Sequence, residues 1–236
     1  MNKKIFLPGS GRQIELTLTK KDLFTPPALV IGSFSADIAL LLAENLNSSI
    51  NLIVEDTDSF LNANLALNSD ERIKTSIMGY DRTDFETGSF GLVYAQASIS
   101  DDRRNKIVKE IKRILKPGGF FSVGEIVKLK KDIPPFVNNI FEGSTLNPLM
   151  DTGISGYYAE RNFKVIEETD LTQTLKEYYM NSALKLSDAK TDLSENEKKY
   201  HKKLLNKISH ETNAYLKLGA DKFIGFKYLL LQKGEN

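Results

Sequence analysis

A glycine and a carboxylate near the start of this sequence could together bind the ribose of a nucleotide. Gly32 follows a short apolar run, and Glu55 closes a second apolar run further along the chain. A glycine lets the backbone turn sharply, and the free N–H groups of a helix that starts there present partial positive charge to a ligand. A carboxylate at the end of the second strand can accept hydrogen bonds from both ribose hydroxyls. Residues 28–55 therefore predict half of a nucleotide site.

The residues after Gly32 depart from the pattern of dinucleotide-binding proteins. Phe34 and Ala36 stand where further glycines are expected, so G-x-G-x-x-G is not matched. The side chain of Phe34 would also crowd a pyrophosphate at this turn. A nicotinamide-dependent dehydrogenase is therefore the least favoured of the enzymes considered.

Alternating strands and helices must position these two residues. After a first strand that begins at residue 28, we expect strands at 50–54, 73–78, 90–95 and 120–127, and helices at 37–46, 59–67 and 101–115. The last helix ends at the terminator Lys116-Pro117-Gly118-Gly119. Such a series predicts an α/β fold with a doubly wound, mostly parallel sheet and helices on both faces.

The second half of the chain is less regular. Residues 128–150 mix Lys, Pro, Asn and Gly, which indicates an irregular connection or a mobile lid. We expect helices at 152–161 and 172–186, a strand at 163–168, a loop at 187–192 and a closing strand at 223–232. Ser194 and Glu197 form a capping box for one more helix, which ends near Gly219.

The first residues carry a separate signal. The turn residues Pro8 to Gly11 lie between two apolar stretches, which predicts a β-hairpin over residues 4–19. A structural appendage is the favoured interpretation, and an edge cover or a dimer contact is the alternative. We therefore divide the chain into an arm, residues 1–27, and a single domain, residues 28–236, in which 128–161 and 171–219 lie on the substrate side.

The composition narrows the class of protein. With 32 basic and 31 acidic residues in 236, and a formal net charge of +1, the chain lacks the basic excess of a nucleic-acid or membrane-surface protein. The absence of cysteine excludes disulfides and thiolate metal sites, and the carboxylates are too dispersed to predict a metal site. We expect a cytoplasmic protein that binds a small molecule.

Five segments in this order resemble a class I S-adenosylmethionine-dependent methyltransferase. They are VIGSFSAD at the first turn, Glu55 after the second strand, ETGSFGLVYAQ, EIKRILKPGGFFSVGE, and the closing pair NFKVIEETDLT and KFIGFKYLLLQK. The resemblance covers residues 28–232 and implies a seven-stranded Rossmann-like sheet that ends in a reversed hairpin. It also implies S-adenosylmethionine as the methyl donor and S-adenosylhomocysteine as the product, and leaves the acceptor and the oligomeric state open.

The resemblance assigns roles to the residues at the ends of the strands. The turn would wrap the methionine part of the cofactor, Glu55 would hold the ribose, the residues near 80 would contact the adenine, and the end of the fourth strand would lie near the methyl group. The implied cofactor residues are Gly32, Ser33, Phe34, Ser35, Glu55, Asp56, Tyr80, Asp81, Ala95 and Gln96.

Departures from this family motivate a second hypothesis. Val30 stands where the family usually has an acid, Phe34 and Ala36 replace glycines, and an acid is also common at the position of Gly91. The alternative is therefore a methyltransferase-like protein that has lost catalysis and serves as a binding or interaction module.

No residue is assigned a catalytic role. Methyl transfer from a sulfonium is an in-line displacement that proximity and orientation can accelerate without a nucleophile from the protein. We interpret His201 and His210 as solvated helix residues in preference to bases. Tyr157, Tyr158, Tyr178 and Tyr179 suit core packing or a substrate pocket, and the lysines of residues 128–131 suit a solvated loop in preference to an anion site.

Overall fold

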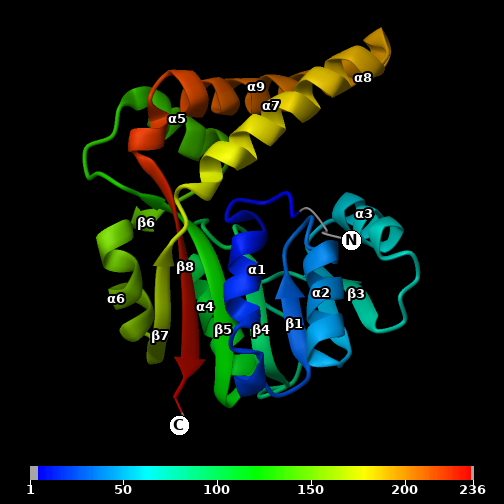
Figure 1. Cartoon of the computed structure of the whole chain (residues 1–236), viewed down its shortest axis with the longest axis vertical. Helices are drawn as coiled ribbons and strands as arrows, with labels where there is room; N and C mark the ends of the chain where they lie inside the picture. Colours follow the sequence, from blue (N-terminus) through cyan, green and yellow to red (C-terminus); the bar gives the residue numbers. More distant parts are fainter. Residues whose placement is uncertain (1–4, 235–236) are drawn as a thin grey trace.

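The computed structural model describes residues 5–234, except for the side chain of Lys190. One twisted sheet organises the chain, with the strand order β3-β2-β1-β4-β5-β8-β7 (Figure 1). The strands are β1 (Ala28–Ile31), β2 (Ile50–Val54), β3 (Ile73–Ile77), β4 (Phe90–Gln96), β5 (Leu115–Lys128), β7 (Phe163–Asp170) and β8 (Ile224–Lys233). β1 to β5 are parallel, whereas β8 runs antiparallel to both β5 and β7. The predicted fold class, including the reversed closing hairpin, is confirmed.

Helices cover both faces of the sheet. On one face, α2 (Ala36–Leu46) and α3 (Thr57–Leu67) contribute buried residues to a core cluster that includes Val30 of β1 and Tyr94 of β4. On the other face, α4 (Arg104–Ile114) and α6 (Ile154–Ala159) pack against the alternate residues of the same strands. The side chains of Ile107, Ile111 and Ile114 are fully buried there, as their helical spacing predicts.

The predicted boundary between α4 and β5 needs a small correction. The helix ends before Lys116-Pro117-Gly118-Gly119 as predicted, but β5 begins at Leu115, so the terminator lies inside the strand. The pairing of β4 with β5 shifts register between Phe90 and Leu92, and this irregularity accommodates the proline and glycines.

The predicted N-terminal hairpin is wrong. Its residue 4 lies outside the described residues, and the remainder contains the helix α1 (Ser10–Leu18), which starts after Gly9 at a φ of 86°. α1 buries two polar residues one helical turn apart: Gln13 donates from Nε2 to the Ala95 carbonyl at 3.1 Å, and the hydroxyls of Thr17 and Ser122 lie 2.8 Å apart. Ile14, Leu16 and Leu18 alternate with polar residues as in a strand, and this alternation, after the turn residues Pro8 to Gly11, favoured the wrong prediction of a hairpin.

Residues 128–150 contain more regular structure than expected. They form α5 (Pro135–Gly143) and the two-residue strand β6 (Leu149–Met150), which pairs with β5. Val137, Ile140 and Phe141 of α5 are buried in the core. Opening of this segment as a lid stays a prediction.

A helical arm extends beyond one end of the sheet (Figure 1). It comprises α7 (Thr174–Asp192), α8 (Glu195–Tyr200) and α9 (Lys202–Lys217). The loop predicted at 187–192 is wrong, because α7 continues through it, whereas the capping box of Ser194 and Glu197 is confirmed. Within the described residues, none of the helices combines the length and the apolar composition that a membrane crossing requires.

Candidate functional site

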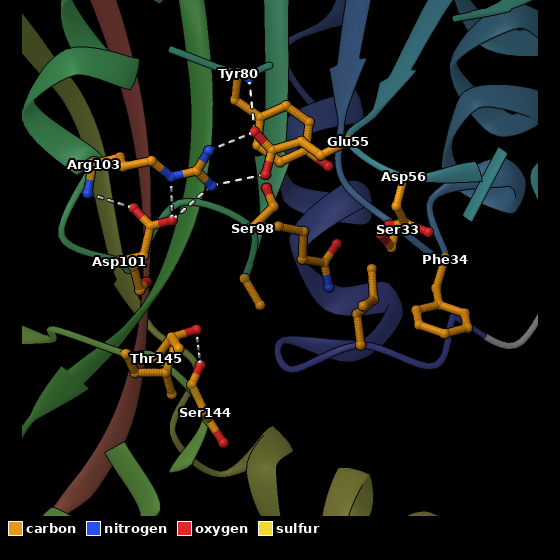
Figure 2. Close-up of a pocket in the computed structure, with 15 residues that line it drawn as sticks. Ser33, Phe34, Glu55, Asp56, Tyr80, Ser98, Asp101, Arg103, Ser144 and Thr145 are labelled. Carbon is orange, nitrogen blue, oxygen red and sulfur yellow. Dashed lines mark hydrogen bonds and ion pairs between the residues drawn. The ribbon is translucent and has the colours of Figure 1, made fainter. Parts of the chain in front are cut away.

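A cavity of about 310 Å³ lies at the carboxyl ends of β1, β2 and β4, the edge where open α/β sheets bind ligands. Six residues proposed from the sequence line it: Ser33, Phe34, Glu55, Asp56, Tyr80 and Gln96. Gly32, Ser35, Asp81 and Ala95 are close in sequence to these residues but are not part of the lining. The cavity therefore gathers the ends of three strands into one site, shown in Figure 2.

The turn after β1 has two unusual backbone positions. Gly32 has a φ of 132°, and a Cβ placed there would lie 2.9 Å from the Cβ of Ser98, so a side chain would meet both backbone strain and a close contact. Phe34 has a φ of 61°, in the left-handed region that glycine favours, and is 74% exposed. An aromatic residue in the left-handed region is uncommon, and here it stands where the family pattern has a glycine.

Glu55 is bound by a guanidinium group. Arg103 donates from Nη1 to Oε1 and from Nη2 to Oε2 of Glu55, both at 2.7 Å, and the backbone N–H of Tyr80 donates to Oε1 at 3.1 Å (Figure 2). Partial burial alone would raise the pKa of Glu55, but the hydrogen bonds from Arg103 and Tyr80 outweigh it and hold this pKa below its ordinary value. Glu55 is therefore ionised at neutral pH and is fixed by the Tyr80 backbone as well as by Arg103.

Two further carboxylates surround the same guanidinium group. Asp101 accepts from Arg103 Nη2 at 2.9 Å, and Asp81 lies 3.9 Å from Nη1. Asp81, proposed as an adenine acceptor, thus reaches the cavity only through Arg103. Arg103 is not among the residues predicted from the sequence, although the polar run Asp101-Asp102-Arg103-Arg104 shortly after β4 is a signal for this edge of the sheet.

Asp56 has a structural role beside the cavity. It caps α3, accepting from the backbone N–H and the hydroxyl of Ser59, each at 2.7 Å. Ser59 in turn lies 2.8 Å from the hydroxyl of Ser33. This chain of hydrogen bonds fixes the turn after β1 against the start of α3.

Gln96 holds the N-terminal segment over the floor of the cavity. Its Nε2 donates to the carbonyls of Pro8 and Ser10 at 2.8 and 2.9 Å, and its Oε1 accepts from the hydroxyl of Tyr94 at 2.5 Å. Leu7, just before this tie, lines the cavity. No sequence signal predicted that Leu7 belongs to the site, because this stretch was assigned to a separate arm.

A buried polar layer lies directly beneath the cavity. Arg104 Nε donates to Oε2 of Glu125 at 2.6 Å, and Ser100 donates to the same oxygen at 3.1 Å. The hydroxyl of Tyr158 donates to the other oxygen, Oε1, and burial raises the pKa of this hydroxyl well above its ordinary value. Arg104 Nη2 also donates to the Asn147 carbonyl at 2.6 Å, so the layer anchors the loop whose residues 144–146 line the cavity.

Two departures from the family pattern have packing reasons. Val30 is fully buried between the sheet and the helices of one face, where an ionised carboxylate would be costly. At Gly91, a Cβ would lie 1.8 Å from the carbonyl oxygen of Thr25, so no side chain fits.

The remaining candidates lie away from this cavity. Neither His201 nor His210 lines it, and Tyr178 and Tyr179 line a second cavity beside α7. Within residues 5–234, no group of three His, Asp or Glu side chains is placed to hold a metal ion. The first cavity presents Glu55 as an acceptor to a ligand that offers hydrogen-bond donors.

The matches to known proteins agree with this fold. Residues 29–123 match the model of a methyltransferase domain family, and a search of curated proteins by sequence gave no significant match. A protein from Galdieria sulphuraria, assigned as a sarcosine dimethylglycine methyltransferase, superposes with a TM-score of 0.76 at 14% identity, over 95% of this chain and 85% of that one. The [4+2]-cyclase SpnF superposes with a TM-score of 0.74 at 16% identity, over 95% and 81%.

A third similar structure contains two bound small molecules. It is phosphoethanolamine N-methyltransferase 2 from Haemonchus contortus, in complex with phosphomonomethylethanolamine and S-adenosylhomocysteine. The TM-score is 0.76 at 17% identity, and the match covers 97% of this chain but only 54% of that enzyme. At such identities, likeness to solved structures concerns the fold, and SpnF illustrates that one fold carries more than one chemistry.

Proposed function

Because this chain carries a methyltransferase domain in the fold of the class I S-adenosylmethionine-dependent methyltransferases, we propose that it transfers a methyl group from S-adenosylmethionine to a small molecule. One observation carries the proposal. Glu55, at the end of β2, faces a cavity bordered by the turn after β1 and is oriented by the Tyr80 backbone. A carboxylate in this position suits the two hydroxyls of a ribose.

The residues around the cavity fit the parts of this cofactor. Glu55 would accept from the ribose, Ser33 and Phe34 would border the methionine part, and Asp56 and Tyr80 would border the adenine. Gly32 and Ser35 would act through the shape of the turn, since neither contributes to the lining. The bound cofactor supplies a methyl group on a positively charged sulfur, a good leaving group.

Arg103 limits how Glu55 can bind the ribose. A carboxylate has about four acceptor positions, and Arg103 and the Tyr80 backbone already use three of those on Glu55. Two ribose hydroxyls therefore need Arg103 to release at least one oxygen. Asp101 and Asp81 can keep the guanidinium group paired while it does so.

The protein's own contribution is to position and to enclose. Residues 144–146 line the side of the cavity opposite the turn and can exclude water when both ligands are bound. Asp81 and Ala95 would act indirectly, Asp81 through Arg103 and Ala95 through its carbonyl contact with Gln13. Gln96 lines the cavity and also holds residues 8–10. We assign no catalytic base.

Calorimetric titration with S-adenosylmethionine and S-adenosylhomocysteine tests the proposal. Glu55→Ala should weaken S-adenosylhomocysteine binding by about 1.5–3 kcal/mol, roughly 10- to 150-fold, because a hydrogen bond to a charged group is lost. Glu71→Ala is the matched control, since Glu71 is exposed before β3, at the opposite end of the strands. Failure of the parent protein to bind either ligand at millimolar concentration would contradict the proposal and favour the binding-module alternative.

A further inference from the structure

A second cavity, of about 470 Å³, lies between the helical arm and the turn after β1. Its walls are mainly apolar, with Leu186 from α7, Leu205 and Ile208 from α9, and the rings of Phe6 and Phe34. A concave site of this size with apolar walls and few polar groups is typical of a small-molecule pocket.

The second cavity adjoins the proposed cofactor cavity at two points. Phe34 lines both, and Figure 2 shows its ring on the opposite side of the first cavity from Arg103. Ser144, which lines the first cavity, donates a hydrogen bond to Glu211, which lines the second. A molecule in the second cavity would therefore lie directly beside a ligand in the first.

The charged groups of the second cavity are engaged by the protein. Lys185 Nζ lies 3.6 Å from the centre of the Phe6 ring, and Glu211 accepts from Ser144 and lies 4.0 Å from Lys207 Nζ. One polar group is different. Thr212 also borders this cavity, but its hydroxyl is fully shielded by the protein and, within residues 5–234, has no hydrogen-bond partner. The lining therefore offers a ligand mainly apolar contacts.

We propose that this cavity binds the hydrocarbon part of the methyl acceptor, so that the acceptor is an elongated, mostly apolar small molecule. The inference rests on the proposed function, since it places the reacting end of the acceptor beside Phe34 and the first cavity. Phe34 is then a specificity-determining residue at the boundary between cofactor and acceptor. A small, fully charged acceptor would leave the apolar walls without a partner.

The test is titration calorimetry of the whole protein with 1-hexanol, 1-octanol and 1-decanol, with and without saturating S-adenosylhomocysteine. If the chain of the alcohol enters the cavity, affinity should rise by about fourfold for each added methylene, or about fifteenfold between successive alcohols. An affinity that does not depend on chain length overturns the inference, whether or not S-adenosylhomocysteine binds. Loss of S-adenosylhomocysteine binding alone instead overturns the proposed function.

Two matched leucine substitutions locate the binding. Leu205→Glu places a carboxylate in the wall of the cavity and should abolish the dependence on chain length. Leu184→Glu makes the same change on the exposed side of α7, outside the cavity, and should leave that dependence unchanged. Thermal melting of both variants separates loss of binding from loss of fold. Equal effects of the two substitutions would overturn the assignment.

A second copy of the chain is the competing occupant. Analytical ultracentrifugation at the concentration of the titration decides this point. A monomer with chain-length-dependent binding supports the acceptor site, whereas a dimer that Leu205→Glu dissociates, with no such dependence, overturns it.

Discussion

Two arginines that are adjacent in the sequence belong to different layers of the site. Arg103 lies at the edge of the first cavity, its side chain 42% exposed, and binds Glu55. Arg104 lies beneath the cavity, its side chain 6% exposed, and binds the fully buried Glu125. We call Phe34, Glu55 and Arg103 the rim, and the second group is the buried layer of Ser100, Arg104, Glu125 and Tyr158.

The difference in burial gives the two ion pairs different uses. An exposed pair contributes about 0–1 kcal/mol, so the rim can rearrange around a ligand at small cost. A buried charge left without its partner costs about 3–5 kcal/mol, so the buried layer keeps a single arrangement. Within the layer, Glu125 binds Ser100, which lines the cavity, and Arg104 binds the Asn147 carbonyl next to residues 144–146. The layer thus holds two walls of the cavity in place. The site thus combines an adjustable rim with a fixed support.

The largest predicted effect is on the buried layer. Arg104→Met should lower the free energy of unfolding by about 3–5 kcal/mol, because the carboxylate of Glu125 stays buried without its charged partner. Urea denaturation followed by circular dichroism measures the loss. The double variant Arg104→Met, Glu125→Gln should recover most of it, since the uncompensated charge is then gone.

The neighbouring arginine is the control for this prediction. Arg103→Met changes the same side chain one residue earlier and should alter the free energy of unfolding by less than about 1 kcal/mol. Equal losses in the two variants would refute the distinction between the rim and the buried layer.

The ion pair of Arg113 and Glu110 is intermediate in burial between the other two, and its contribution to stability should depend on pH. Burial opposes ionisation of Glu110, but hydrogen bonds from Arg113 and from the side chain and backbone of Thr83 lower its pKa from 4.5 to about 2. A lowered pKa stabilises the fold above the unfolded value, and that stability is lost as the pH falls from about 4.5 toward 2. After allowance for solvent screening we expect a loss of about 1–2 kcal/mol.

Comparison with Glu110→Gln isolates this contribution. The difference in free energy of unfolding between the parent and the variant should shrink between about pH 5 and pH 2.5, since protonation removes the same charge as the substitution. A difference that stays constant over this range would mean that Glu110 is not the titrating group.

A substitution of Phe34 tests the rim without changing its charge. Its φ of 61° disfavours any side chain, and its ring is largely exposed, so Phe34→Gly removes strain while losing little buried area. The net result should be a gain of about 1 kcal/mol in the free energy of unfolding, with S-adenosylhomocysteine binding retained. Destabilisation by the same amount would show that the ring supports the fold and is not merely a boundary between the cavities.

The sequence predicted the sheet and its ligand-binding edge because these depend on short-range patterns. β2 follows from a continuous apolar run and α4 from apolar residues at helical spacing, and Gly32 and Glu55 follow from their places at strand ends. Six of the ten cofactor-binding residues predicted from the sequence line the first cavity. The roles of these candidates in cofactor binding stay a prediction.

The missed features depend on contacts between distant parts of the chain. α1 was missed because its apolar and polar residues alternate as in a strand, and only its contacts with distant strands show that Gln13 and Thr17 face inward. Arg103 and Arg104 are equally basic in the sequence, and only the tertiary fold gives one of them solvent and the other Glu125. The residues 144–146 reach the cavity because Arg104 holds the carbonyl of the next residue, Asn147.

The smallest predicted effect concerns the competition at Glu55. In the free protein Arg103 uses both oxygens that a ribose would need, but the pair is only partly buried, and solvent screening keeps its contribution to about 0.2–1 kcal/mol. Arg103→Met removes this competition, and S-adenosylhomocysteine should bind up to about fivefold more tightly in calorimetric titration. Raising the salt concentration should narrow the difference, because screening weakens the ion pair in the parent only. If the variant instead binds tenfold more weakly, Arg103 itself contacts the ligand, and the rim is held in one arrangement as firmly as the layer beneath it.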